Sequence, residues 1–465
     1  MALERGQGRN RLARWFPAAL LAGIGLLIWR IFFPALMSFD SFVQFRQAWT
    51  GEYNDWHPPL MAIVLHGFFR LGRGIGAVTF IQCLAGMLGL RALVLGTLGA
   101  FFGPAVPRRR AEGIAVAVAL FLVSPLTPLP FYLATFWKDS WAAILLLWIC
   151  AVSLELLSEP PESTQDGRRW LRISSLVLLS TTLGLVRHNA IVVLPVAGLV
   201  LAVASWRSSR PLAVTLALAP LLVCGITDRA IAGIYHVQPA HLERLMMVFD
   251  LAGVCALDER ACSDLPYAQR HFVLQGLGQR YVPGDMDRSF PHGLAVRDED
   301  ASLLRDEYLR TIRRFPRLFM RVKIEAFAPL LDPAGVRTLM YRGLDGNEFG
   351  LRLNPRFEGV RAALTQATLW AGEKNPVLRW ISGVHLVWFA ANLLWIVALL
   401  VAAGRRRLAL ALLLPLSFYM SYLLATPEPD YRFLYPATLA LQAMTLAVTL
   451  QTLAVWASGR RTARS

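Results

Sequence analysis

Apolar runs about twenty residues long recur along this chain, and they constrain its fold more than any other feature. A helix of this length crosses about 30 Å of hydrocarbon. Hydrophobic residues make up 55% of the 465 positions and charged residues only 17%, a balance too apolar for a soluble chain of this size. The sequence therefore predicts an all-α polytopic membrane protein with about ten transmembrane helices.

Arginine clusters in the short connections set the expected orientation, because basic residues in such loops stay on the cytoplasmic side. One consistent topology results if segment 58–71 is a short juxtamembrane helix that lies in the outer interface or is re-entrant, and is not a span. Both termini are then cytoplasmic, and loop 38–74 lies outside. The ten expected spans are 12–37, 75–102, 111–131, 141–157, 171–186, 190–206, 211–234, 380–403, 408–425 and 433–456.

This topology divides the chain into three parts. Residues 1–235 form an N-terminal transmembrane module, and residues 376–465 form a C-terminal one. The stretch 236–375 is too charged to cross a membrane, and we expect it to fold outside as a mainly helical domain. It contains Cys255 and Cys262, the only cysteines expected outside the spans. Oxidising conditions there favour a disulfide between them.

Polar residues that interrupt the apolar pattern gather on the expected outer side. Charges close to a membrane are costly, and they tend to be paired or functional. For any single residue, a solvated loop end is the simpler interpretation. As a set, they predict one shared site. Its candidate members are Asp40, Asp55, His57, Lys138, Asp139, Arg187, His188, Asn189, Glu428, Asp430 and Arg432.

Several short motifs resemble the membrane-embedded glycosyltransferases of the GT-C superfamily. Asp40 lies in the first outer loop, soon after the first span, and His57-Pro58-Pro59-Leu60 opens a juxtamembrane helix. Further on, the motifs similar to a bacterial branch of these proteins are Phe136-Trp137-Lys138-Asp139, Arg187-His188-Asn189 and Asp430-Tyr431-Arg432-Phe433-Leu434-Tyr435-Pro436. The resemblance covers the layout and these motifs, spread over residues 38–436.

The resemblance implies a hexosyl- or pentosyltransferase in a bacterial inner membrane. Such an enzyme moves a sugar from a polyprenyl-phosphate carrier to a glycan, lipid or protein acceptor on the extracytoplasmic face. Asp40 is the candidate general base for the acceptor hydroxyl. The leaving lipid phosphate needs fixed cations, for which the candidates are Lys138, Arg187, His188 and Arg432. The candidate substrate contacts are Asp55, His57, Asp139, Asn189, Asp430 and Tyr431.

Two of these assignments have simpler alternatives. His57 could merely precede a helix that starts with proline, and Asp139 could be the ion-pair partner of Lys138. Many GT-C members carry a second acid beside the first, which helps to hold a divalent metal. Here Ser41 and Phe42 follow Asp40, so a metal stays open but is not favoured.

Other classes of function are weaker but remain open. The net charge of +16 fits topology signals and contacts with anionic membrane lipids better than nucleic-acid binding. No glycine-rich phosphate loop supports a nucleotide sugar. The alternatives are a transporter or flippase for a lipid-linked glycan, a ligase that transfers a whole glycan, and a non-catalytic scaffold.

Overall fold

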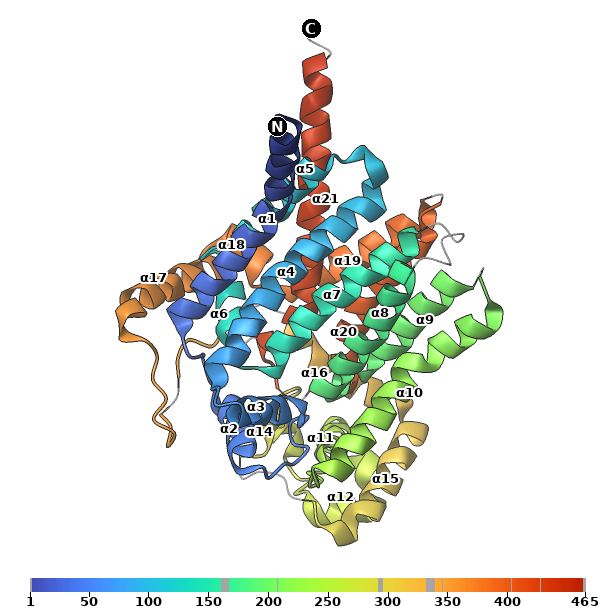
Figure 1. Cartoon of the computed structure of the whole chain (residues 1–465). Coiled ribbons are helices and arrows are strands. Elements are labelled where there is room, and N and C mark those ends of the chain that lie inside the picture. Colours follow the sequence, from blue (N-terminus) through green and yellow to red (C-terminus); the bar gives the residue numbers. More distant parts are fainter. Residues whose placement is uncertain are drawn as a thin grey trace.

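The computed structural model describes residues 2–159, 167–206, 208–291, 296–331, 339–344, 346–402, 404–426 and 428–462, and side chains within 15–458. These ranges contain helices and no β-strand (Figure 1). The first ten helices are α1 (Ala2–Phe32), α2 (Phe39–Thr50), α3 (Leu60–Arg70), α4 (Ile75–Phe102), α5 (Arg108–Leu122), α6 (Leu129–Ala134), α7 (Lys138–Ser158), α8 (Gly167–Val186), α9 (Val193–Ser205) and α10 (Arg210–Ile234).

The remaining helices include several short elements and end with longer apolar ones. They are α11 (Leu242–Leu257), α12 (Pro266–His271), α13 (Leu277–Arg280), α14 (Met286–Ser289), α15 (Ala301–Arg314), α16 (Pro316–Leu331), α17 (Glu358–Leu369), α18 (Pro376–Ser382), α19 (His385–Val401), α20 (Ala409–Leu424) and α21 (Tyr435–Thr462).

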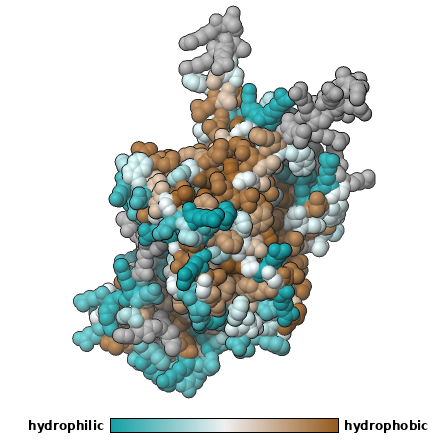
Figure 2. Space-filling view, turned by 60° about the vertical axis from the view of Figure 1, so that its left-hand side comes forward, coloured by the Kyte–Doolittle hydropathy of each residue, from teal (hydrophilic) through white to brown (hydrophobic). Residues whose placement is uncertain are grey.

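Eight helical segments in the described ranges are long and apolar enough to cross a membrane. They centre on α1, α4, α7, α8, α9, α10, α20 and α21. The pair α18 and α19, bent by 59°, would add a ninth if it counts as one span. A broad apolar surface covers the middle of the molecule, with hydrophilic surface below it (Figure 2). The chain is therefore a multi-pass membrane protein, as the apolar runs predict.

The expected span 111–131 differs from a single helix. The structure has α5 and the six-residue α6 instead, separated by a stretch that is not α-helical. Pro125, Pro128 and Pro130 lie in or beside this break, and proline both lacks an N–H and clashes with the preceding turn. After α6, Thr135 forms a β-bridge with Leu36, which returns the chain to the end of α1.

The expected span 380–403 is also interrupted. Gly383 lies between α18 and α19, and a Cβ atom at this position would lie 2.6 Å from the carbonyl oxygen of Gly372. The close approach of these two backbones requires glycine, and the helix axis changes direction there.

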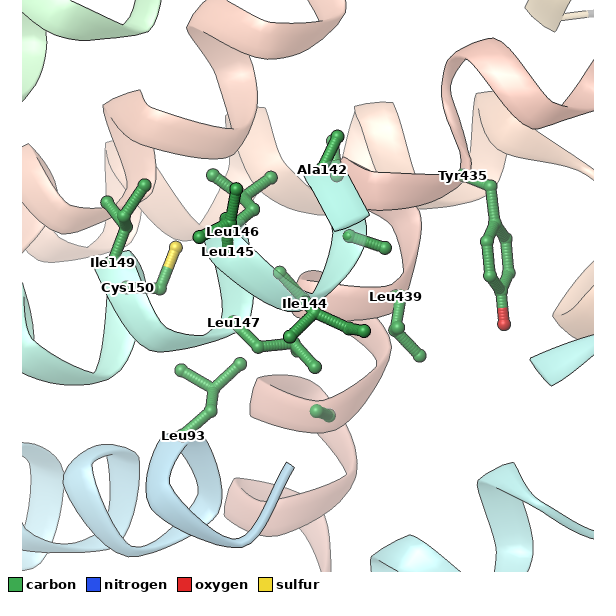
Figure 3. Close-up of a cluster of buried hydrophobic side chains, with 14 of the residues drawn as sticks. Leu93, Ala142, Ile144, Leu145, Leu146, Leu147, Ile149, Cys150, Tyr435 and Leu439 are labelled. Carbon is green, nitrogen blue, oxygen red and sulfur yellow. The ribbon is translucent and has the colours of Figure 1, made fainter. Parts of the chain in front are cut away.

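The centre of the bundle is formed by α4, α7 and α21 (Figure 3). Leu93, Leu146, Cys150 and Leu439 are among its buried side chains. A Cβ on Gly96 of α4 would lie 3.2 Å from the carbonyl oxygen of Ala151 in α7. Small residues of this kind let membrane helices pack closely, which brings α4 and α7 together here.

The two ends of the bundle differ in character. Helix α1 begins and α21 ends at the top in Figure 1, whereas α2, α3, α11, α12 and α15 lie at the bottom. Helices α11 to α15 enclose a second, small core around the disulfide between Cys255 and Cys262. Helix α17 lies apart from them and packs near α1, where Arg361 donates to the carbonyl oxygen of Ile31 at 3.0 Å.

Candidate functional site

Asp40 lies in the first turn of α2, at the end of the bundle where the chain leaves α1. The preceding Ser38 and the following Ser41 fix this turn. Trp137 Nε1 donates to Ser38 Oγ at 2.7 Å, and Ser41 Oγ donates to the carbonyl oxygen of Phe136 at 2.8 Å. The start of α2 is therefore tied to the segment that leads into α7. An acid in the first turn is also favoured by the helix dipole.

Four segments distant in sequence meet at the Asp40 carboxylate. Arg432 Nη1 donates to Asp40 Oδ2 at 2.7 Å. His57 Nε2 lies 3.6 Å from Asp40 Oδ1, which is a polar contact longer than a hydrogen bond. Lys138 Nζ lies 2.7 Å from His57 Nδ1. Because the lysine nitrogen donates, Nδ1 accepts and the imidazole proton belongs on Nε2, facing Asp40.

Arg432 is surrounded by three carboxylates. Besides Asp40, Glu428 Oε1 lies 3.2 Å from its Nη2, and Asp430 Oδ2 lies 2.9 Å from its Nε. The guanidinium also lies over the ring of Trp137, 5.1 Å from its centre. Burial lowers the pKa of Arg432, but the three carboxylates outweigh this effect and raise it above its usual value. Arg432 therefore stays charged and organises the acidic side chains.

The same charges act on the pKa of Asp40 and of His57. Burial raises the pKa of Asp40, but His57, Arg432 and Lys138 together hold it well below its usual range. Burial lowers the pKa of His57, and the charges of Lys138 and Arg432 lower it further against the opposing effect of Asp40. At neutral pH the structure thus holds an ionised Asp40 beside a neutral imidazole.

A second ion pair joins Arg187 to Asp139, the residue that follows Lys138. Arg187 Nη1 donates to Asp139 Oδ1, and Asp139 is fully buried. Arg187 Nε donates to Asn189 Oδ1 at 2.9 Å, and Asn189 Nδ2 donates to Ser421 Oγ at 2.7 Å. The Arg187 guanidinium lies over the ring of Tyr422. This group joins α7, the turn after α8, and α20, so Asp139 pairs with Arg187 and not with the adjacent lysine.

Three predicted site residues make other contacts. His188 Nε2 lies 3.0 Å from the carbonyl oxygen of Asp55, while the Asp55 carboxylate accepts from the backbone N–H of Ala240. Tyr431 is fully buried, and its hydroxyl donates to the carbonyl oxygen of Ser382 at 2.6 Å. His188 and Asp55 thus fasten the loop between α2 and α3, and Tyr431 fastens the loop that carries Arg432.

Sequence reasoning assigned no role to three contributors. Ser38 and Ser41 orient the turn of Asp40, and the Trp137 ring covers Arg432. Glu428 was in the predicted set without a role, and here it is a partner of Arg432. The available signal was its spacing, because acids at positions 428 and 430 precede a lone arginine at 432.

Charge balance limits what this cluster can bind as it stands. It contains the cations Lys138, Arg187 and Arg432 and the carboxylates Asp40, Asp139, Glu428 and Asp430. Each of the three cations already has a partner within hydrogen-bonding distance. Arg432 is shared by three carboxylates, so a further anion would compete with them for its guanidinium. The described residues include no group of three or more His, Cys, Asp or Glu side chains arranged to hold a metal.

Comparisons with protein-family models, with curated proteins and with solved structures gave no match to this chain.

Proposed function

We propose that this protein is a membrane-embedded glycosyltransferase of the GT-C type that uses a polyprenyl-phosphate-linked sugar. The observation that carries the proposal is the arrangement around Asp40. An ionised carboxylate with a quarter of its side-chain surface exposed lies between a fixed guanidinium and a neutral imidazole, at one end of a bundle of apolar helices. The membrane end that holds Asp40 is then the extracytoplasmic one.

In this reaction the acceptor oxygen forms a bond to the anomeric carbon as the bond from that carbon to the phosphate oxygen breaks. The hydroxyl proton passes to Asp40, and the electron pair leaves with the lipid phosphate. A carboxylate can accept this proton, and it can also stabilise the positive charge that develops on the sugar. Arg432 and Lys138 are the cations nearest to Asp40, and they would stabilise the charge on the phosphate.

The low pKa of Asp40 fits this sequence of events. A carboxylate paired with arginine is a weak base, so the free site holds Asp40 ionised but poorly reactive. A phosphate that binds Arg432 would offset part of the positive charge that lowers the pKa of Asp40. The pKa of Asp40 would then rise when donor is bound, which is when proton transfer is needed. Arg432 thereby couples donor binding to activation of the base.

The location of the charges supports transfer over transport. The ion pairs of Asp40, Asp139, Arg187 and Arg432 lie near the ends of the spanning helices, not at their midpoints. Transporter sites usually lie near the middle of the bilayer, at broken helices. A flippase remains the alternative if no transfer is found.

The test is sugar transfer by the purified full chain from a labelled pool of polyprenyl-phosphate sugars. Asp40→Asn keeps the shape and removes the base, and we expect transfer to fall by at least about 100-fold. Asp264→Asn is the matched control, because Asp264 is an exposed aspartate that pairs with Arg314 away from the site. It should transfer at the wild-type rate.

Full activity of Asp40→Asn would refute the role of Asp40 as base. Absence of transfer by the wild-type chain, over a broad set of carriers and acceptors, would refute the proposal and favour the flippase alternative.

A further inference from the structure

A cavity of about 710 Å³ lies beside the Asp40 cluster, along one face of α2. Its walls come from α2, from residues 50–54, from Gln238 and from residues 346–349. The volume falls within the range of small-molecule sites. Phe39 of the lining precedes Asp40 in the first turn of α2, whereas the side chains of the Asp40 cluster are not part of the lining.

Aromatic rings form part of the walls. The rings of Phe42 and Phe349 are parallel within 10°, with centres 6.4 Å apart. Phe39 also lines the cavity and exposes 77% of its surface. Flat apolar rings of this kind pack against the C–H faces of sugar rings, whose hydroxyl groups remain free to meet polar groups at the edges.

Polar groups with unmet hydrogen-bonding capacity occur in the same lining. Gln47 and Tyr53 each expose only 5% of their surface. Gln47 Nε2 donates to Asn54 Oδ1 at 3.0 Å, but Gln47 Oε1 and the Tyr53 hydroxyl have no hydrogen-bond partner in the part of the chain that the structure describes. A buried polar atom without a partner is costly. Both atoms have almost no accessible surface, so a ligand rich in hydroxyl groups would supply the missing bonds once the side chain turns towards the cavity.

The charges of the lining argue against an anionic ligand. Arg46 is the one basic residue among the described lining residues, and it pairs with Glu348 at 2.5 Å. Glu52 adds a further negative charge. A phosphate or a nucleotide would meet no free cation here, whereas an uncharged polyhydroxyl ligand needs no cationic partner.

We propose that this cavity binds a neutral saccharide, the acceptor of the transfer reaction. The inference rests on the proposed function and decides between the acceptor classes in favour of a glycan. A sugar packed against the exposed aromatic faces of the lining would present its terminal hydroxyl towards the first turn of α2. The donor phosphate would approach Arg432 from the lipid side, so the two substrates would occupy separate regions on either side of Asp40.

The test measures binding, which needs no transfer. The full chain is placed in lipid nanodiscs, because alkyl-maltoside detergents would themselves compete. Saturation-transfer NMR and native mass spectrometry then probe neutral oligosaccharides, namely pentasaccharides of the malto-, chito-, manno- and arabino- series. We expect at least one series to bind wild type, and Phe349→Ala to abolish that binding.

Two matched pairs of variants separate the cavity from its surroundings. Gln47→Leu should weaken binding at least about fivefold, as expected for a lost buried hydrogen bond. Gln44→Leu is its control, because Gln44 lies on the same helix, is equally buried and also has an unpartnered Oε1 among the described residues, but does not line the cavity. Tyr53→Phe should likewise weaken binding. Its control is Tyr281→Phe, because the Tyr281 hydroxyl also has no partner among the described residues but belongs to the small core and does not line the cavity.

Binding by no member of the panel would overturn the inference, and so would equal losses in Gln47→Leu and Gln44→Leu. These failures are distinct from failure of the proposed function. Saccharide binding in a chain that transfers no sugar would refute only the glycosyltransferase. Transfer to a lipid or protein acceptor, with no saccharide bound in the cavity, would refute only the acceptor site.

Discussion

The buried pair of Asp250 and Lys323 allows a quantitative prediction about how α11 and α16 are held to the bundle. Lys323 Nζ donates to Asp250 Oδ2, and the two side chains are only 5% and 3% exposed, respectively. Tyr308 donates to the same carboxylate oxygen at 3.0 Å. Lys323 also donates to the carbonyl oxygen of Leu424 at 2.7 Å, just before the loop that carries Arg432.

Replacing the lysine by methionine leaves Asp250 buried without a cation. Burial already raises the pKa of Asp250, against the lowering effects of Lys323 and Tyr308. Without the ammonium, the buried carboxylate is neutralised at the lowest free-energy cost when the folded state binds a proton. At pH 7, protonating a carboxyl of ordinary pKa costs about 4 kcal/mol, and at pH 5 it costs about 1.5 kcal/mol. The pH 7 figure agrees with the roughly 3–5 kcal/mol lost when one partner of a buried pair is removed.

The sign of the pH dependence follows from linkage. In Lys323→Met the folded-state pKa of Asp250 lies above the unfolded value, so the folded state binds more protons. Stability therefore falls as pH rises towards the folded-state pKa. Local opening of α11 and α16 should become about 1000-fold more frequent at pH 7 but only about tenfold more frequent at pH 5.

Hydrogen-exchange mass spectrometry measures this opening, once the intrinsic pH dependence of exchange is corrected. The double variant Asp250→Leu with Lys323→Met should recover most of the protection, because replacing both charges with apolar groups removes the stranded carboxylate. Arg314→Met, which breaks an exposed pair with Asp264, is the control and should change nothing. Equal losses at pH 5 and pH 7, or a double variant as weak as the single one, would refute the reasoning.

Two further predictions concern packing and pH. A Cβ at Gly198 would lie 2.0 Å from the carbonyl oxygen of Ala217, so Gly198→Ala should separate α9 from α10 and lower the melting temperature. Gly225→Ala meets nothing within 4 Å and should leave the melting temperature unchanged or raise it, and equal effects of the two would contradict the packing. Burial lowers the pKa of His57, so the unfolded chain binds more protons and wild type loses stability as pH falls through and below the ordinary histidine pKa of about 6.5. In melting scans from pH 7 to pH 5, His57→Gln should lose less stability than wild type, and parallel curves would argue against a neutral buried imidazole.

Hydropathy alone was enough to predict most of the bundle. Eight of the ten expected spans correspond to long apolar helices. Inside a bilayer the backbone must satisfy its own hydrogen bonds, so a long apolar run has few alternatives to a helix. The break between α5 and α6 was missed because hydropathy does not register backbone constraints, although Pro125 and Pro128 offered a local signal. The bend at Gly383 had no such signal, since it depends on the nearby backbone of Gly372.

The membership of the candidate site was easier to predict than its pairings. Few charges interrupt the apolar pattern, so the sequence identified most of those that meet. Their partners could not be read in the same way, because Asp40 and Arg432 are 392 positions apart and Asp139 pairs with Arg187 instead of its neighbour. Tyr431 shows a further limit. It is adjacent to Arg432, but its side chain contacts His385 and Ser382, and sequence adjacency does not reveal direction.

The charge balance of the cluster leads to a last prediction about donor binding. With His57 neutral, four carboxylates face three cations, so an incoming lipid phosphate adds negative charge to a site that already has an excess. Burial raises the pKa of Glu428 despite its contact with Arg432, and of the three carboxylates around that guanidinium, Glu428 is the most exposed and has the longest contact. Glu428 is therefore the group that should give up Arg432 and take a proton.

Binding of a polyprenyl phosphate should then be accompanied by proton uptake. Calorimetry in buffers of different ionisation enthalpy measures this number directly, and affinity should weaken as pH rises above neutrality. In Glu428→Gln the competing charge is gone, so binding should be tighter and independent of the buffer, whereas Arg432→Gln should bind weakly at any pH. Proton uptake that persists in Glu428→Gln would indicate that the proton goes to Asp430, whose pKa burial also raises. Donor binding by wild type without proton uptake would mean that the phosphate does not replace a carboxylate on Arg432.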